Sequence, residues 1–330
     1  MLKEASRPSV AIRFLGSAAI AVLMLGAFGL PGAVQATEVR QQAKVPPQGD
    51  EHLKPTGKGW GERDSTGLTA KQAAKFARPS TNGISYHGGP IMLGTVNMYY
   101  IWYGAWDFTN NADNIATYTL LNAFGSYIGG TPYFNINTTY YDSTKTAVNG
   151  LVAAPRNATV TDGSSSLSDQ GVQDVVTNVI ASGALPSDPN GVYFVLTSKE
   201  VRETSGFCTK YCAWHSYDKN TKIKFGFIGN PVDQCPSSCS WQATTPNSNF
   251  AADTMANLIA HELAEAVTDP EFTAWFDQRG YENADKCAWR FGSTTTTNGA
   301  QSNVTFGGRN WLLQQNWINA GGGYCTLEKK

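Results

Sequence analysis

Three side chains suited to metal chemistry lie close together between residues 257 and 270. His261 and Glu265 are four residues apart, so a helix places them on one face, and Glu262 directly follows the histidine. Zinc peptidases use a helix of the form His-Glu-x-x-His, in which both histidines bind one ion and the glutamate is the general base. Glu265 replaces the second histidine here, which keeps a permissible zinc ligand and adds negative charge. The spacing predicts a zincin-like active-site helix with His261 and Glu265 as zinc ligands and Glu262 as the catalytic base.

A third ligand is expected from the acidic segment 275–287, which follows this helix. Glu282 comes seventeen residues after Glu265, and Asp285 comes shortly after Glu282. A later glutamate completes the ligand set in glutamate-type zinc peptidases, and a nearby acidic residue holds the first histidine. We therefore expect Glu282 as the third ligand, and Asp285 as a further ligand or as the carboxylate that orients His261. Such a site activates water for attack on an amide or ester carbonyl.

Further side chains are expected to orient these ligands or to replace one of them: Asp269, Asp277 and His215. Asp269 ends the helix, where the helix dipole disfavours a carboxylate unless a cation is near; alternatively, it binds the backbone amides of a turn. Asp277, Glu282 and Asp285 could instead form a calcium loop, since hard carboxylate oxygens suit that ion.

The pattern of apolar residues indicates an α/β fold, with a mixed β-sheet and flanking helices. Buried strands are expected from β-branched and aromatic composition at 96–103, 132–141, 191–197 and 223–228. Amphipathic helices are expected at 109–127 and 169–181. The helix that carries His261 is expected to start after an N-cap at Ser248 or Asn249 and to stop before Pro270, because a residue before proline avoids the helical conformation.

The six cysteines predict loops that are stapled by disulfides, as in exported proteins. They are Cys208, Cys212, Cys235, Cys239, Cys287 and Cys325. The two Cys-x-x-x-Cys pairs most simply close small local loops and leave Cys287 to pair with Cys325, although pairing across the two pairs is also possible. A zinc site of Cys208, Cys212 and His215 is the competing interpretation, but thiolate zinc sites are uncommon in oxidising compartments.

The start of the chain has the order of a secretory signal peptide. Basic residues precede an uncharged apolar run over 14–30, and small residues up to Ala36 suit cleavage after that position. The polar segment 37–83 is interpreted as a flexible linker or pro-segment, which leaves one α/β domain at 84–330. We therefore expect a secreted, extracellular protein that has no membrane association after signal cleavage.

The charge balance argues against nucleic acid as a partner. The chain has 25 Lys and Arg against 26 Asp and Glu, and removing 1–36, with three basic residues and one acidic, leaves a net charge of −3. Such a surface does not attract a phosphate backbone. An extracellular protein or cell-wall material is the expected substrate or partner.

Several motifs in the chain, taken together, resemble the EXORDIUM or phosphate-induced protein family. The likeness covers about residues 84–327 and rests on Tyr-His-Gly-Gly-Pro at 86–90, Ile-Trp-Tyr-Gly at 101–104, the segment 208–215, Cys-Pro-Ser-Ser-Cys-Ser-Trp at 235–241 and the helix at 252–270. The His-Glu-x-x-Glu helix resembles the microbial branch, because the plant proteins lack its histidine and glutamate. The resemblance implies this fold and a place in the cell wall or apoplast, with no settled biochemical activity.

Two functions remain open. The first is a secreted zinc-dependent hydrolase, with a peptidase as the preferred form. The second is a non-enzymatic extracellular protein, associated with the cell wall or surface, that holds a structural calcium ion or no metal.

Overall fold

The computed structural model describes residues 83–330, with the exception of residue 162. The expected signal peptide at 1–36 lies outside this range, as does the expected linker or pro-segment at 37–83 apart from its last residue. None of the helices in the described part of the chain has the length and hydrophobicity that a bilayer crossing requires.

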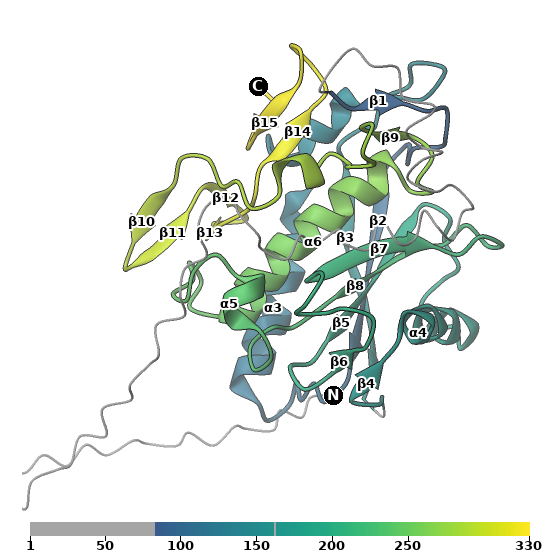
Figure 1. The fold of residues 1–330 in the computed structure, drawn as a ribbon. Coiled ribbons are helices and arrows are strands. Elements are labelled where there is room, and N and C mark those ends of the chain that lie inside the picture. The colour runs from purple at the N-terminus through teal and green to yellow at the C-terminus, as the bar shows by residue number, and fades with distance from the viewer. Residues whose placement is uncertain (1–82, 162) are drawn as a thin grey trace, which may run out of the picture. The chain divides into compact units, whose positions relative to one another are not determined.

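A five-stranded mixed sheet forms the centre of the described part (Figure 1). Its strands are, in spatial order, β3 (Val152–Val160), β2 (Val96–Tyr103), β5 (Gly191–Thr197), β8 (Lys224–Ile228) and β7 (Ala213–Tyr217). The first four run parallel, whereas β7 pairs antiparallel with β8 at the edge of the sheet. Parallel strands need covered faces, and β2 and β5 are accordingly buried on both sides.

Helices cover the two faces of this sheet: α3 (Ala112–Ile128), α4 (Asp169–Ala181) and α6 (Phe250–Thr268). The crossover from β2 to β3 through α3 runs one way across the sheet, and the crossover from β3 to β5 through α4 runs back. Because both crossovers are right-handed, α3 and α4 lie on opposite faces. Helix α6 packs beside α3 and contacts β7 and β8, as Figure 1 shows.

Short elements surround this core. Small two-stranded pairs are β1 (Ser85–Tyr86) with β9 (Trp275–Phe276), β4 (Ser166–Leu167) with β6 (Arg202–Glu203), β10 (Thr295–Thr297) with β11 (Ala300–Ser302), β12 (Val304–Phe306) with β13 (Arg309–Trp311), and β14 (Asn316–Ile318) with β15 (Tyr324–Thr326). The remaining helical segments are α5 (Pro236–Cys239) and the 3₁₀ turns η1 (Phe134–Thr139) and η2 (Asp285–Cys287). Turn η2 follows α6 in the chain and returns to it in space.

The predicted α/β class with a mixed sheet is confirmed, and so are most of the predicted elements. The strands at 96–103 and 191–197 and the helix at 169–181 have the expected bounds. The strand predicted at 223–228 and the helix predicted at 109–127 shift by one to three residues. Helix α6 is capped by Asn249, whose side chain accepts a hydrogen bond from Ala252 N at 2.8 Å.

The strand predicted at 132–141 is wrong, because residues 134–139 form a 3₁₀ helix. Hydroxyl groups stabilise this turn locally: Thr131 Oγ1 accepts from Phe134 N at 3.1 Å, and Thr138 Oγ1 donates to Asn135 O at 2.8 Å. Side chains that bond the nearby backbone compete with strand pairing, which composition alone does not reveal.

The prediction that each Cys-x-x-x-Cys pair closes a local disulfide loop is also wrong. The bonds instead join one pair to the other. Cys208 pairs with Cys235, and Cys212 pairs with Cys239. Cys235 caps the start of helix α5 and Cys239 is its last residue, so the two side chains are one helical turn apart and project from the same face toward the loop that precedes β7. The predicted bond between Cys287 and Cys325 is confirmed.

Candidate metal centre

Helix α6 presents three ionisable side chains that are completely buried. His261, Glu262 and Glu265 each have 0% of their surface exposed. The whole helix is enclosed between the sheet, α3 and the C-terminal segments, so these groups have no access to bulk water. Buried charges need a partner or an ion, because an isolated charge in an apolar interior costs several kcal/mol or more.

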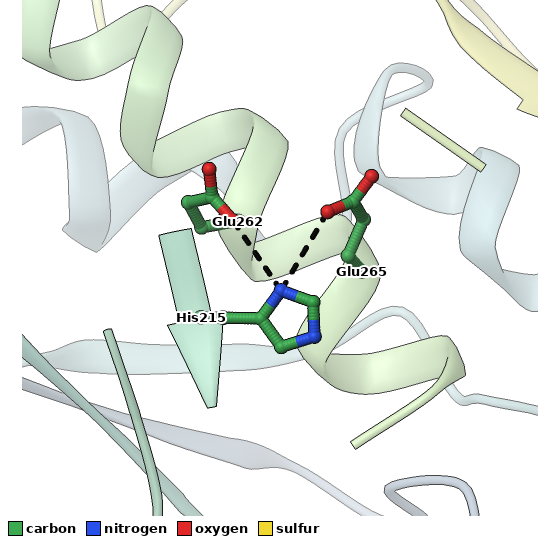
Figure 2. A group of neighbouring side chains, drawn as sticks. All are labelled: His215, Glu262 and Glu265. Carbon is green, nitrogen blue, oxygen red and sulfur yellow. Dashed lines mark hydrogen bonds and ion pairs between the residues drawn. The ribbon is translucent and has the colours of Figure 1, made fainter. Parts of the chain in front are cut away.

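Strand β7 brings a second histidine to these carboxylates, as Figure 2 shows. His215 Nδ1 lies 3.3 Å from Glu262 Oε2 and 3.5 Å from Glu265 Oε2. The antiparallel register pairs His215 with Gly226 of β8, where a side chain would collide with Trp214 O and the ring of Phe194. The edge strand and the helix thus share one cluster of donor atoms.

The segment after α6 adds two more carboxylates. Glu282 Oε1 lies 3.8 Å from His215 Nε2, and Asp285 Oδ1 lies 3.8 Å from His261 Nε2. The turn η2 is held against the helix because Asp285 N donates to Glu265 Oε1 at 3.0 Å. His261 Nε2 is 3.1 Å from the same oxygen.

Gln314 fixes the other side of His261 and was not anticipated from the sequence. Its side-chain amide contacts His261 Nδ1, which leaves Nε2 directed toward Glu265 and Asp285. Gln314 is itself fully buried, and its backbone N donates to Asn257 Oδ1 at 2.8 Å. Asn257 is one helical turn before His261, but nothing in the residue types links either position to Gln314.

The electrostatics of the cluster follow from burial and crowding. Burial raises the pKa of Glu262, and burial together with the charge of Glu265 raises the pKa of Asp285 well above its usual value. Burial opposes ionisation of Glu265, but His261 and His215 lower its pKa to about 2. Burial likewise opposes protonation of His261, yet Glu265, Glu262 and Asp285 raise its pKa to about 9. Without a metal ion, bound protons neutralise the negative charge of the buried carboxylates.

The donors fall into two groups that can each hold a metal ion. The first is His215, Glu262 and Glu265, and the second is His261, Glu265 and Asp285. Within each group, one ligand atom per residue lies within 4.8 Å of the others. Imidazole nitrogen combined with carboxylate oxygen suits zinc and related transition metals, whereas calcium prefers oxygen donors alone.

Comparison with known proteins agrees with this architecture. Residues 84–309 match the family model for the phosphate-induced protein 1 conserved region. The chain belongs to the phosphate-induced protein 1 family. It is 25% identical to Protein EXORDIUM-like 3 of Arabidopsis thaliana, over 74% of this chain and 82% of that protein. It is 23% identical to Protein EXORDIUM of the same plant, over 70% and 84%, and 22% identical to Protein PHOSPHATE-INDUCED 1 of Nicotiana tabacum, over 61% and 69%. No solved structure matches.

The resemblance inferred from the motifs is therefore confirmed. The region of the family model contains every donor of the two groups and Glu282, while Gln314 and Cys325 lie beyond its end. As a member of this family the chain has relatives named for induction by phosphate, and those names state no chemical activity.

Other residues singled out in the sequence lie near the centre but in neither donor group. Asp269 Oδ1 accepts a hydrogen bond from Ala274 N at 2.6 Å and so stabilises the turn after α6. Asp277 pairs with Lys286 at 3.0 Å and caps the turn to Tyr281, whose N lies 2.9 Å from Asp277 Oδ1. Cys208 and Cys212 are both in disulfides, so the thiolate zinc site with His215 is not formed.

A pocket approaches α6 one helical turn before His261. It is lined in part by Asp253, Thr254 and Asn257 of the helix and by Trp241 and Phe291. The pocket therefore reaches the same stretch of α6 that Gln314 connects to His261.

Proposed function

We propose that this member of the family is an extracellular, zinc-dependent hydrolase that cleaves peptide bonds. The observation that carries the proposal is the set of His261, Glu265 and Asp285 donors on and beside one helix, with Glu262 adjacent. His261, Glu265 and Asp285 would hold the ion. Glu282, whose Oε1 lies 3.8 Å from His215 Nε2, would not be one of its ligands. A bound zinc ion supplies Lewis acidity that activates water and polarises a carbonyl.

Glu262 is the residue that would take the proton from the attacking water. Its Oε1 is buried and has no hydrogen-bond partner among the described residues, so this oxygen has lone pairs free to accept. Burial raises the pKa of Glu262, in the direction a general base needs in order to work near neutral pH.

A peptide is the favoured substrate because the cluster adjoins the edge of the sheet. Strand β7 pairs with β8 on one side, and in the described range no strand pairs with its other side. An open strand edge can align an extended peptide through backbone hydrogen bonds. Extracellular location is part of this proposal, and the three disulfides are compatible with it.

Metal content and activity test the proposal together. The purified chain is loaded with zinc, dialysed and assayed by plasma mass spectrometry, beside His261→Ala and the control His87→Ala. His87 stacks on Phe276 and belongs to neither donor group. Bound zinc in the wild type and in His87→Ala, with less zinc bound in His261→Ala, is the expected result. Cleavage of a fluorogenic peptide library by the wild type and not by Glu262→Gln is the second expectation. A metal-free wild-type protein, or equal cleavage by Glu262→Gln, would overturn the proposal.

A non-enzymatic extracellular protein with a structural ion is the second candidate, because the donor side chains are so deeply buried. His261, Glu262 and Glu265 are 0% exposed and Asp285 is 7% exposed, whereas catalytic zinc keeps one position open to water or substrate. Bound metal combined with no cleavage, and a lower melting temperature after metal removal, would favour this candidate.

A further inference from the structure

We propose that the cluster holds two metal ions and that the carboxylate of Glu265 bridges them. The inference rests on the proposed function only in treating the cluster as a metal site. The two donor groups share Glu265 and no other residue. Its two oxygens face different imidazoles: Oε2 lies 3.5 Å from His215 Nδ1, and Oε1 lies 3.1 Å from His261 Nε2. One carboxylate that points each oxygen at a different histidine is suited to bridging.

The donor distances around His215 fit an ion better than a shared proton. Hydrogen bonds between an imidazolium and a carboxylate are about 2.7–2.9 Å long. Donors bound tetrahedrally to one zinc at about 2.0–2.1 Å are about 3.4 Å apart. His215 Nδ1 is 3.3 Å from Glu262 Oε2 and 3.5 Å from Glu265 Oε2, which matches the edge of such a tetrahedron.

Unpartnered buried oxygens lie in both donor groups. In the part of the chain that the structure describes, Glu265 Oε2 and Asp285 Oδ1 have no hydrogen-bond partner. Glu265 Oε2 lies 3.5 Å from His215 Nδ1, and Asp285 Oδ1 lies 3.8 Å from His261 Nε2. Each group therefore has a carboxylate oxygen that an ion bound in that group would satisfy.

Each histidine turns one ring nitrogen toward Glu265. Nδ1 of His215 faces Glu262 and Glu265, and Glu282 lies 3.8 Å from its Nε2, beyond hydrogen-bond distance. Gln314 contacts Nδ1 of His261, so Nε2 points to Glu265 and Asp285. Metal-binding imidazoles are commonly held, as His261 is, by a second group on the nitrogen that does not bind the ion.

Charge also favours two ions. Glu262, Glu265, Glu282 and Asp285 carry four negative charges when all are ionised. One divalent ion would leave a charge of −2 in a buried space, while two divalent ions bring the cluster to neutrality. Buried uncompensated charge is costly, so the second ion removes a penalty that a single ion leaves.

The number of bound ions tests the inference. The full chain is loaded with zinc alone, dialysed, and its zinc content is measured by plasma mass spectrometry. We expect two ions in the wild type and in the control His87→Ala, one in His215→Ala, one in His261→Ala, and fewer than one in Glu265→Ala. Circular dichroism checks that each variant is folded.

A second measurement does not depend on variants. Cobalt replaces zinc, and electron paramagnetic resonance at low temperature reports whether two ions are close enough to couple. Bridged ions in two-metal sites are about 3.5–4 Å apart, so the signal of the fully loaded wild type should be weaker than that of two isolated ions.

The outcomes separate this inference from the proposed function. One ion per wild-type chain that His261→Ala removes and His215→Ala keeps would overturn the second site and leave the hydrolase proposal intact. Two ions without magnetic coupling, or two ions retained by His215→Ala, would also overturn the bridge. No bound ion in the wild type would overturn both proposals.

Discussion

His215 Nδ1 lies 3.3 Å from Glu262 Oε2, although the two residues are 47 positions apart in the chain. The strand β7 carries His215, and the helix α6 carries Glu262. Their contact joins the edge of the sheet to the helix that covers it, so the donor cluster is assembled only when sheet, helix and the C-terminal segment have all packed. Substitutions that disrupt the donor cluster should therefore weaken the packing of these elements, and substitutions that disrupt this packing should weaken the donor cluster.

Gln314→Ala should lower metal affinity without removing a donor. Gln314 holds the ring of His261, and loss of such an orienting partner typically weakens metal binding about 10- to 100-fold. Competition for zinc against a chromophoric chelator measures the change. Gln315→Ala is the matched control and should bind like the wild type, since the backbone N of Gln315 bonds to Arg290 O and its side chain is outside the cluster. Equal loss in both variants would contradict the role of Gln314.

Removal of the metal should destabilise the folded protein. The donor carboxylates are buried and lose their compensation when the ion leaves. An ion present at one hundred times its dissociation constant stabilises by about 2.7 kcal/mol, which for a domain of this size corresponds to about 5–10 °C in melting temperature. Differential scanning calorimetry before and after a chelator measures the shift, and added zinc should restore it. A melting temperature that does not respond to the chelator in wild type would count against a metal in this cluster.

Asp218→Ala should destabilise the protein at neutral pH and have a smaller effect in acid. Asp218 Oδ1 accepts hydrogen bonds from Asn220 N and Thr221 N, at 2.9 and 2.7 Å, in the turn between β7 and β8. These hydrogen bonds outweigh partial burial, which acts in the opposite direction, and lower the pKa of Asp218 below its usual value. The folded state thus favours the carboxylate, and its stabilisation is present above the unfolded pKa of about 3.9 and lost as pH falls through the lower folded value.

Urea unfolding of wild type and Asp218→Ala at pH 7 and pH 3 measures this dependence. We expect a difference of about 1 kcal/mol at pH 7, because the group is partly exposed and its hydrogen bonds are screened, and a smaller difference at pH 3. Asp174→Ala is a suitable control on helix α4, since Asp174 Oδ1 accepts only from the neighbouring Gln170 side chain at 2.9 Å among the hydrogen bonds found for it. A pH-independent difference for Asp218→Ala would contradict the assignment.

The crossed disulfides predict a specific product after trypsin digestion without reduction. Cleavage after Lys210 separates Cys208 from Cys212, whereas no Lys or Arg separates Cys235 from Cys239. The peptides 203–210 and 211–219 should therefore both remain attached to the peptide 225–279, giving one three-peptide species in mass spectrometry. Local loops would instead join 203–210 to 211–219 and release 225–279 on its own.

Much of the fold could be predicted from the sequence because the deciding signals are local. The strand at 96–103 is a continuous β-branched and aromatic run, and the helix at 169–181 shows apolar residues at helical spacing. The strands β3 and β7 were not predicted. Both lie at edges of the sheet, where the residues mix exposure and burial and the pattern is weaker.

What the sequence by itself determined is the helix with His261, Glu262 and Glu265, since spacing along one helix follows from its 3.6-residue repeat. It also indicated that His215, Glu282 and Asp285 were candidates, because their types suit ligation. Only the tertiary structure decided their grouping: which nitrogen of each imidazole faces which carboxylate, that Glu265 lies between both groups, and that Gln314 orients His261. The physical reason is that these contacts join β7, α6, η2 and residue 314, whose approach depends on how the sheet, helix and C-terminal segments pack and leaves no periodic pattern in the chain.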